Sequence, residues 1–331
     1  MAADGGSRSR LEPVVADARR AVRDALSDLD PGAVVLVGLS GGADSLALLS
    51  AACFEAPRAG LRCGAVVVDH GLQAGSADVA ATAARQAREL GADPVDVRRV
   101  EVTGAGGREA AARTARRQAL RAAATDQGAA AVLLGHTLDD QAETVLLGLA
   151  RGSGPRSLSG IAPCDGLWRR PFLGLRRSQT EAVCRAVGLS WWDDPHNRDE
   201  TLSRVRVRTR LLPALETELG PGVAEALART AALARADADL LDAQATELAI
   251  AVTDSDGALD VAALATAPTA LRTRVLRRAA LAAGCPATDL TAGHVAALAR
   301  LVTDWHGQRG VDLPGRVTAR RIEGRIRLDR T

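Results

Sequence analysis

The stretch AVVLVGLSGGADS, residues 33–45, joins a continuous apolar run to a glycine-rich turn. A run without polar residues, such as the one from Ala33 to Leu39, is typical of a strand that is buried on both faces. Gly41 and Gly42 interrupt the strand, and the residues after them follow a helical pattern. The stretch therefore predicts a strand, a tight turn and a helix.

Strand-like and helix-like segments alternate around this stretch. Short apolar runs follow at about 65–68, 95–102 and 130–134, and helical patterns cover about 11–29, 43–53, 76–90, 108–126 and 139–150. The alternation predicts an α/β fold, a doubly wound parallel sheet with helices on both faces. Ligands bind such sheets at the carboxyl ends of the strands, where we expect Ser40, Asp69 and His136.

The rest of the chain has a different pattern. Residues from about 151 to 215 are rich in Gly, Pro, Trp and Arg. Helical patterns follow at about 177–187, 216–250 and 259–303, and a β-like tail at 316–328. The sequence therefore predicts two domains: an α/β domain at 1–215 and a smaller, mainly helical domain at 216–331.

Composition limits the chemistry. The chain has 331 residues, of which 42 are basic and 40 acidic, so only local clusters of charge can indicate a partner. None of the basic residues is a lysine, which excludes mechanisms that need a protein lysine, such as a Schiff base or a phosphate-binding lysine.

The cysteines and the apolar runs indicate the compartment. Five cysteines, widely spaced and never in a C-x-x-C pattern, favour neither a disulfide framework nor a metal site. There is no apolar leader and no run of about 18 apolar residues. We therefore expect a cytoplasmic protein without a membrane span. The oligomeric state stays open, a homodimer included.

The glycine-rich turn carries the first candidate site. Backbone N–H groups of such a turn and the positive end of the following helix converge on one anion, and glycine allows its close approach. Serine hydroxyls can donate to the same phosphate, and Asp44 can hold Mg²⁺ against it. The residues assigned to the phosphate are Ser40, Gly41, Gly42, Ala43, Asp44 and Ser45.

This turn resembles the S-G-G-x-D-S signature of the PP-loop ATP pyrophosphatases, enzymes that split ATP into AMP and pyrophosphate. The resemblance implies ATP and Mg²⁺ as cofactors and adenylation of a substrate. It leaves the acceptor open, because the superfamily includes synthetases, tRNA thiolases and tRNA(Ile)-lysidine synthetases.

A second motif, GHTLDDQAET at residues 135–144, lies where a strand gives way to a helix. Asp140 and Glu143 are three residues apart, so they share a face near the positive end of the helix. Two carboxylates there can bind Mg²⁺ or an ammonium group. The alternative is that Asp139 caps the helix and the acids after it are solvated. The presence of the first motif in the same chain disfavours this alternative.

The second motif resembles the H-x-x-D-D-x-x-E-T segment of the tRNA(Ile)-lysidine synthetases. Further blocks of that family follow in order: Asp69-His70-Gly71-Leu72, Glu109 to Arg117, Arg151 to Gly154, Arg170-Pro171-Phe172-Leu173, Trp192 to Asn197, and Arg204 to Arg208 before Leu211-Leu212-Pro213. The chain departs from the family pattern at Gln73, Arg117, Thr137, His196 and Val205.

The resemblance implies a reaction. These enzymes join free L-lysine to the wobble cytidine of a tRNA(Ile) with a CAU anticodon. ATP adenylates the C2 oxygen of the cytidine, and the lysine ε-amine then displaces AMP. Residues 1–215 would form the ATP-binding catalytic domain, and residues 216–331 would recognise the tRNA.

The acids receive roles on this basis. We assign Asp44 and Asp140 to catalysis and to metal binding. Asp140 and Glu143 are assigned to substrate binding, for metal or for the lysine α-amino group, and Asp140 is preferred over Asp139.

The basic residues complete the predicted site. His136 is assigned to the nucleotide, and His136 and His70 are candidates to accept the amine proton, although a structural hydrogen bond is the commoner role. Arg113 and Arg208 are assigned to the substrate and Arg204 to catalysis. Arg204 and Arg208 share a face of the expected helix, which could grip a phosphate; the alternative is a solvated basic helix.

Local charge indicates where the tRNA binds. Residues 151–215 hold twelve arginines against six acidic residues, and the tail from 316 to 331 holds six against two. Three tryptophans, Trp168, Trp191 and Trp192, lie in the arginine-rich segment and could stack on a base, although we expect packing for two of them.

Two other functions remain at this stage. One is another PP-loop enzyme, a tRNA thiolase or an amidotransferase-coupled synthetase; the missing cysteine pair and glutaminase module disfavour both. The other is a non-catalytic RNA-binding relative, which the intact turn and the acids Asp140 and Glu143 disfavour.

Overall fold

The computed structural model describes residues 12–71, 75–101, 108–152 and 154–330. Contacts divide the chain into two compact units, Met1–Ala232 and Leu233–Thr331, and the division falls inside helix α10 (Val223–Val252). The domain boundary expected between 215 and 216 stays a prediction.

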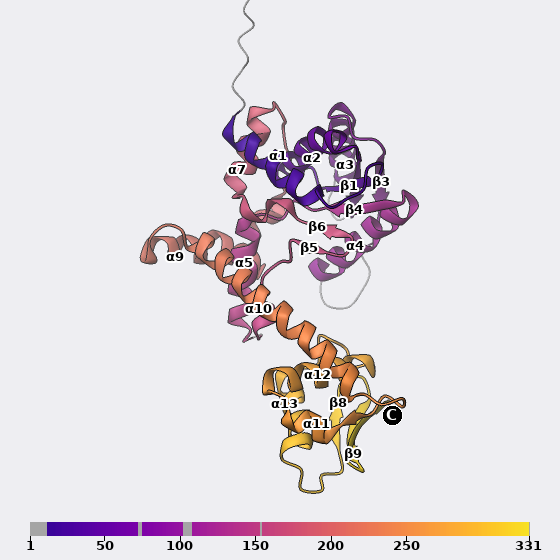
Figure 1. Cartoon of the computed structure of the whole chain (residues 1–331). Helices are drawn as coiled ribbons and strands as arrows, with labels where there is room; N and C mark the ends of the chain where they lie inside the picture. Colours follow the sequence, from indigo (N-terminus) through magenta and orange to yellow (C-terminus); the bar gives the residue numbers. More distant parts are fainter. Residues whose placement is uncertain (1–11, 72–74, 102–107, 153, 331) are drawn as a thin grey trace, which may run out of the picture. The chain divides into compact units, whose positions relative to one another are not determined.

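A six-stranded sheet forms the centre of the first unit (Figure 1). Its strands lie in the order β3 (Val95–Arg99), β2 (Arg62–Asp69), β1 (Val34–Leu39), β4 (Ala129–Leu133), β6 (Trp168–Arg169) and β5 (Cys164–Asp165). All neighbours are parallel except β5 and β6. The predicted doubly wound sheet is confirmed. The order reverses direction between β1 and β4, and the crevice at such a switch point is where ligands bind.

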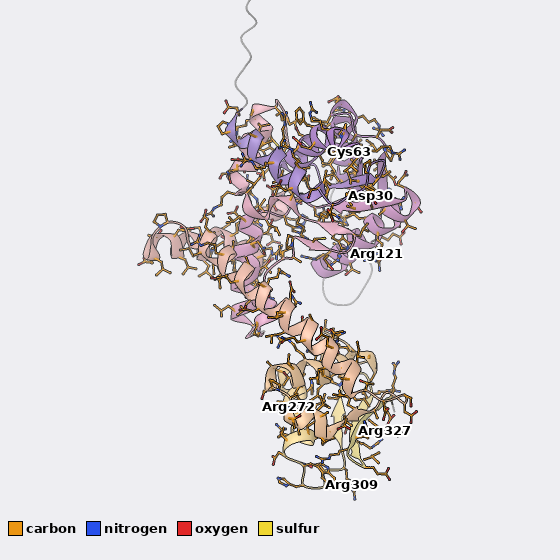
Figure 2. The ribbon with its side chains drawn as sticks, viewed as in Figure 1. Asp30, Cys63, Arg121, Arg272, Arg309 and Arg327 are labelled. Carbon is orange, nitrogen blue, oxygen red and sulfur yellow. The ribbon has the colours of Figure 1, made fainter. Side chains whose placement is uncertain are left out.

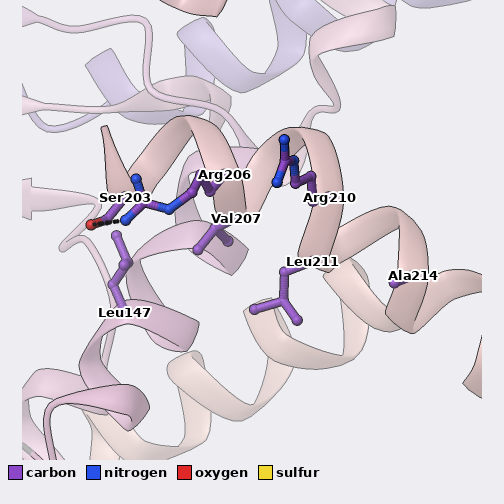
Figure 3. A pocket seen from close by; sticks show the side chains of 7 residues that line it. All are labelled: Leu147, Ser203, Arg206, Val207, Arg210, Leu211 and Ala214. Carbon is purple, nitrogen blue, oxygen red and sulfur yellow. Dashed lines mark hydrogen bonds between the residues drawn. The ribbon is translucent and has the colours of Figure 1, made fainter. Parts of the chain in front are cut away.

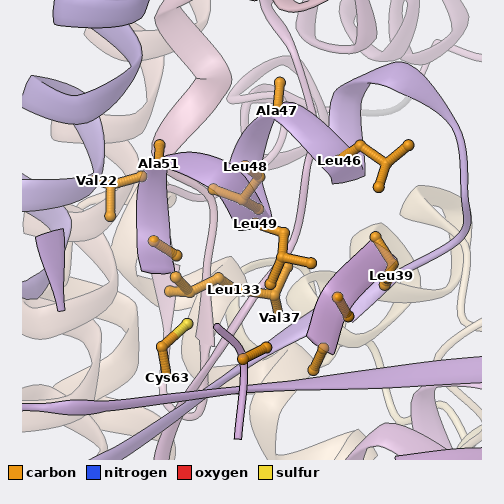
Figure 4. Packing of buried hydrophobic residues seen from close by; sticks show 14 of the residues in the cluster. Val22, Val37, Leu39, Leu46, Ala47, Leu48, Leu49, Ala51, Cys63 and Leu133 are labelled. Atoms are coloured by element: carbon orange, nitrogen blue, oxygen red, sulfur yellow. The ribbon is translucent and has the colours of Figure 1, made fainter. Parts of the chain in front are cut away.

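Helices cover both faces of this sheet. They are α1 (Pro13–Leu26), α2 (Ala43–Glu55), α3 (Ser76–Glu89), α4 (Arg108–Asp126), α5 (Leu138–Ala150) and α7 (Arg177–Ala186), with a 3-10 turn at Pro57–Ala59. Val35, Val37 and Leu39 of β1 pack in one core with residues of α1, α2, α3 and α7 (Figure 4). Leu36 packs on the opposite face with Leu120 of α4. The strand is therefore buried on both faces, as its apolar run predicts.

The arginine-rich segment folds against α5. It contains α6 (Pro155–Leu158), 3-10 turns at Pro171–Gly174 and Pro195–Arg198, α8 (Ser203–Arg206), a π-helical turn at Val207–Leu211, and α9 (Leu212–Leu219). A small core of Leu138, Ala142, Val207, Leu212 and Ala224 joins this segment to α5. Two-residue strands β5 and β6 were not predicted, because they are too short to show a pattern.

The second unit combines helices with a small sheet. Its helices after α10 are α11 (Val261–Thr266), α12 (Thr269–Ala282) and α13 (Ala292–Thr303), and its antiparallel strands are β7 (Leu259–Asp260), β8 (Val311–Leu313), β9 (Val317–Ile322) and β10 (Arg325–Arg330). Leu264, Leu276, Leu298 and Ile326 are fully buried in its core. The expected helices and β-like tail are confirmed, and β7 and β8 extend the sheet.

None of the helices in the described ranges is both long and apolar enough to cross a membrane.

Candidate active site

The glycine turn lies between β1 and α2, at the switch point of the sheet. Gly41 has φ +81°, a left-handed conformation that favours glycine. Gly42 is the N-cap of α2, and among the described residues no side chain caps this helix end. The turn is held from outside by the backbone N–H of Trp192, which donates to the carbonyl oxygen of Gly41 at 2.9 Å. An uncapped helix end preceded by glycine fits a phosphate group.

The two serines of the turn differ in their surroundings. Ser45 is buried; its Oγ accepts from the backbone N–H of Ser40 at 3.1 Å and donates to the carbonyl oxygen of Gly42 at 3.0 Å. Ser40 is exposed, and its Oγ lies 3.1 Å from the Oγ of Ser45. Ser45 therefore shapes the turn, and Ser40 presents its hydroxyl at the surface of the turn.

Asp140 has one oxygen in the helix cap and one facing the site. The backbone N–H and Oγ1 of Thr137 donate to Asp140 Oδ2 at 2.8 and 3.1 Å, which closes a capping box at the start of α5. Asp140 Oδ1 lies 3.7 Å from both Arg177 and Arg208. The cap is therefore Thr137, and the alternative of a cap at Asp139 is wrong.

Asp139 joins α5 to α7 instead. Its Oδ2 accepts from the backbone N–H of Arg177 at 2.7 Å, and its Oδ1 accepts from Arg176 at 3.1 Å. Arg176 also donates to Glu216 and Glu225, so one guanidinium ties three acids together. Both oxygens of Asp139 therefore have structural partners. Asp140 is the better candidate for binding a ligand, because one of its oxygens faces the site.

Glu143 is completely buried between two arginines. Arg208 donates to it through Nε and an Nη atom, at 2.6 and 3.1 Å. Arg204 Nε lies 3.6 Å from Glu143 Oε2, and Arg204 also donates to the hydroxyl of Thr144 at 3.0 Å. Burial raises the pKa of Glu143, and the charge of Arg208 opposes this shift. Arg204 and Arg208 lie on the same face of their segment, as the sequence predicts, and this face contacts Glu143.

Arg206 and Arg210 lie on a different side of the same segment. Arg206 donates to the carbonyl oxygens of Glu200 and Thr201, and Arg210 pairs with the Glu200 carboxylate. They border a groove of about 470 Å³ together with Leu147, Ser203, Val207, Leu211 and Ala214 (Figure 3). Arg204 and Arg208 thus contact the buried Glu143, whereas Arg206 and Arg210 line the groove.

Asp44 approaches Asp140 across the crevice. Asp44 Oδ1 accepts a hydrogen bond from the hydroxyl of Thr180, and Oδ2 accepts from Arg177 Nε at 3.3 Å. Burial and, less strongly, the charge of Asp140 raise the pKa of Asp44, while Arg177 lowers it. Arg177 thus links the acids of the two predicted motifs. Neither Arg177 nor Thr180 was predicted as a site residue, and only the R-R pair at 176–177 hinted at the first.

A cavity of about 220 Å³ opens beside the glycine turn, at the ends of β1 and β2. Ser40, Asp69, His70, Arg116 and Trp192 are among its lining residues. Trp192, one of the three tryptophans of the arginine-rich segment, thus lines the cavity. The other two pack, as expected: Trp168 is buried, and Trp191 lies against the core of the sheet.

Two histidines near the turn are neutral at physiological pH. Burial lowers the pKa of His136 to about 4 and also lowers the pKa of His70. The Nδ1 atoms of both are buried, and within the described part of the chain neither has a hydrogen-bond partner. The charges of Arg116 and Arg113 contribute to the shift of His136, so both arginines act on this site. Arg113 is exposed on α4.

The donor set fits Mg²⁺ rather than zinc. In the described ranges, no three His, Cys, Asp or Glu side chains gather into a metal cage. Asp44 and Asp140 are two carboxylates close to one guanidinium, and Mg²⁺ is held by one or two carboxylates together with substrate phosphates and water.

Known proteins match both units of the chain. Residues 15–215 match the PP-loop domain family, and residues 259–327 match the TilS substrate binding domain. A tRNA(Ile)-lysidine synthase of Thermobifida fusca (strain YX) is 58% identical over 95% of this chain and 97% of its own length. One from Salinispora tropica is 52% identical over 96% of both chains.

A solved structure shares the fold. The U34-tRNA thiolase NcsA from Methanococcus maripaludis, solved with its [4Fe-4S] cluster, superposes with a TM-score of 0.55 at 19% identity, covering 66% of this chain and 78% of that one. Such low identity shows the fold alone. The identity to the synthases, which extends over nearly the whole length, shows more: this chain belongs to the tRNA(Ile)-lysidine synthase family.

Proposed function

We propose that this protein uses ATP to join free L-lysine to the C2 position of the wobble cytidine in a CAU-anticodon tRNA(Ile), releasing AMP and pyrophosphate. The observation that carries the proposal is the meeting of Asp44 from the glycine turn with Asp140 from the second motif at Arg177. An ATP site and an acidic site for a second substrate then lie within one crevice.

The first step is the adenylation of the cytidine. The N-terminus of α2, the glycine turn and Ser40 bind the phosphates of ATP, and glycine leaves no side chain in their way. Asp44 and Asp140 would hold Mg²⁺, which, when bound, offsets negative charge on the phosphates. Arg204 donates to the hydroxyl of Thr144 at 3.0 Å and lies 3.6 Å from Glu143, and its charge would stabilise a phosphate group bound beside it.

The second step is the attack of the lysine amine. A free lysine amine has a pKa near 10.4, so its neutral form costs about 4 to 5 kcal/mol at pH 7. The binding of the other ammonium group of the substrate by Asp140 and Glu143 stays a prediction; in the structure both oxygens of Glu143 accept from Arg208, so this acid holds Arg208 in place. Of the two histidines predicted as acceptors, His136 is a weak base, because burial lowers its pKa to about 4, and this shift does not favour it as the group that takes the proton.

The tRNA is bound by arginines of both units. Arg113 is exposed on α4, and Arg309 and Arg327 are exposed on the second unit (Figure 2). Arg272 is different, because its guanidinium donates to carbonyl oxygens at the end of α11 and stabilises the fold. Residues 216–331 serve as the tRNA-recognition domain, and the reaction takes place in the cytoplasm.

Thiolase-like chemistry is not favoured. The sulfur atoms of Cys53 and Cys63 lie 3.8 Å apart, but Cys63 is buried and the pair lies between α2 and β2, away from the glycine turn. A non-catalytic role is not favoured either, because the synthase relatives are similar over nearly their whole length.

The test is a labelling assay with purified protein, ATP, Mg²⁺, radiolabelled lysine and a CAU-anticodon tRNA(Ile) transcript. We expect label to enter the tRNA and AMP to form in equal amount. Absence of label from the tRNA, together with transfer of sulfur or ammonia, would contradict the proposal. A transcript with cytidine 34 replaced by uridine is the control.

A further inference from the structure

Two carboxylates, from the first turns of α2 and α5, share one guanidinium group. Arg177 Nε lies 3.3 Å from Asp44 Oδ2, and its Nη2 atom lies 3.7 Å from Asp140 Oδ1. The charge of Asp140 adds to burial in raising the pKa of Asp44, so the two acids repel each other. The guanidinium of Arg177 lies within 4 Å of an oxygen of each acid and offsets this repulsion.

Arg177 is held less firmly than the arginines around it. Arg208 makes two hydrogen bonds to Glu143, and Arg176 donates to three carboxylates. Within the described residues, the Arg177 side chain makes a single hydrogen bond, of 3.3 Å, and its second contact is too long to be one. The guanidinium is therefore the most easily displaced cation of the three.

The carboxylates keep their positions through other bonds. The hydroxyl of Thr180 donates to the second oxygen of Asp44, and Thr137 donates to the second oxygen of Asp140. The backbone N–H of Arg177 is fixed by Asp139 at 2.7 Å. Rotation of the Arg177 side chain would therefore free Asp44 Oδ2, leave Asp140 Oδ1 with only its 3.7 Å contact to Arg208, and keep the frame of the site in place.

We propose that Arg177 is an internal counter-cation which a divalent cation must displace, so that cation binding depends on ATP. The phosphates of ATP offer the guanidinium another anionic partner, and the freed oxygens of Asp44 and Asp140 then accept the divalent cation. Without ATP, Arg177 competes with the cation for the same two oxygens. The inference rests on the proposed function, which places the phosphates on residues 40–45 and Mg²⁺ on Asp44 and Asp140.

The test measures Mn²⁺ binding to the full chain, with and without ATP, by the electron paramagnetic resonance signal of free Mn²⁺, and protein-free solutions with the same ATP concentration give the signal lost to ATP itself. We expect wild type to bind Mn²⁺ weakly without ATP and at least tenfold more tightly with it. Arg177→Gln should bind Mn²⁺ at least tenfold more tightly than wild type without ATP, and ATP should raise the affinity of this variant by a smaller factor than that of wild type.

A matched control separates displacement from net charge. Arg185 lies on the same helix, is exposed and pairs with Glu181, so Arg185→Gln removes the same charge away from the acids. We expect it to behave as wild type. Arg177→Lys keeps a positive charge on a shorter side chain with less reach to both acids, and we expect an intermediate affinity. This variant replaces Arg177→Gln if the latter does not fold.

The outcomes are distinct. Equal Mn²⁺ affinity of the Arg177 and Arg185 variants without ATP would overturn the inference, even if wild type transfers labelled lysine to tRNA. Tighter binding by the Arg177 variants supports it. If they bind more tightly and yet wild type transfers no lysine, the proposed function fails and the competition between Arg177 and the cation stands.

Discussion

A Cβ atom on Gly135 would lie 2.9 Å from the carbonyl oxygen of Asp44. The loop after β4 and the first turn of α2 therefore touch backbone to backbone, and this contact brings the two motifs of the site together. Real side chains do not approach a backbone oxygen so closely, which explains why glycine stands at this position.

We expect Gly135→Ala to push the loop after β4 and the first turn of α2 apart. The overpacking should cost about 1–3 kcal/mol of the free energy of unfolding, and lysine transfer should fall more than stability does, because Asp44 and Asp140 would separate. Urea denaturation and the labelling assay measure the two effects. Gly174→Ala is the control, since a Cβ there meets no atom within 4 Å. Wild-type activity in Gly135→Ala would contradict the loop contact.

Asp44→Asn and Asp140→Asn should each abolish incorporation of labelled lysine. Both changes remove a negative charge that the site needs for Mg²⁺, while the arginines that bind tRNA remain. Retention of tRNA on a filter should therefore stay close to that of wild type. Asp17→Asn, at a half-buried acid paired with Arg20 on α1, is the control. Turnover at the wild-type rate by both site variants would refute the assignment.

Arg208→Gln should destabilise the protein, because Glu143 is completely buried and would lose two hydrogen bonds. Removing one partner of a buried pair costs about 3 kcal/mol. The loss should be smaller at pH 5 than at pH 7.5: burial already raises the pKa of Glu143, loss of Arg208 raises it further, and the protonated form needs no cation.

Urea denaturation at the two pH values measures this difference. Arg206→Gln is the control from the same segment; its guanidinium bonds only to exposed groups, and the change should cost less than about 0.5 kcal/mol. Equal destabilisation by Arg208→Gln at both pH values would mean that Glu143 does not take up a proton.

His136 should make stability depend on pH. Its pKa is lowered to about 4, so the folded state binds fewer protons than the unfolded state between that value and about 6.5. Neutral His136 therefore contributes to the free energy of unfolding above pH 6.5. This contribution is lost as the pH falls towards 4, and the loss reaches about 3 kcal/mol. His136→Gln should flatten the curve of unfolding free energy over this window. An unchanged slope would show that His136 titrates normally.

Binding of tRNA should depend on salt through the exposed arginines of the second unit. Arg309→Gln combined with Arg327→Gln should weaken binding and reduce the slope of log affinity against log salt by about 0.7 to 0.9 for each lost phosphate contact. Arg272→Gln should lower stability and leave this slope unchanged, because Arg272 bonds to backbone carbonyls. Filter binding over a series of salt concentrations provides the measurement.

The sequence predicted most of the first unit, because the pattern and the structure share one physical cause. Parallel strands buried on both faces have to be apolar throughout, and the helices between them have to carry an apolar face. The turn at 40–45 and a helix beginning near 139 followed from the same local rules, but the cap of that helix at Thr137 did not. Strands β5 and β6 did not, since two residues are too few to show a period.

The sequence by itself determined which residues are available for chemistry: a glycine turn after a buried strand, a pair of acids at a helix start, and arginines in place of every lysine. The tertiary structure decided which charges meet. Arg177 is 133 residues from Asp44 in the chain, and Arg208 is 65 residues from Glu143. An ion pair depends on a few ångströms of distance, which only the packing of α7 and the π-helical turn against α2 and α5 sets.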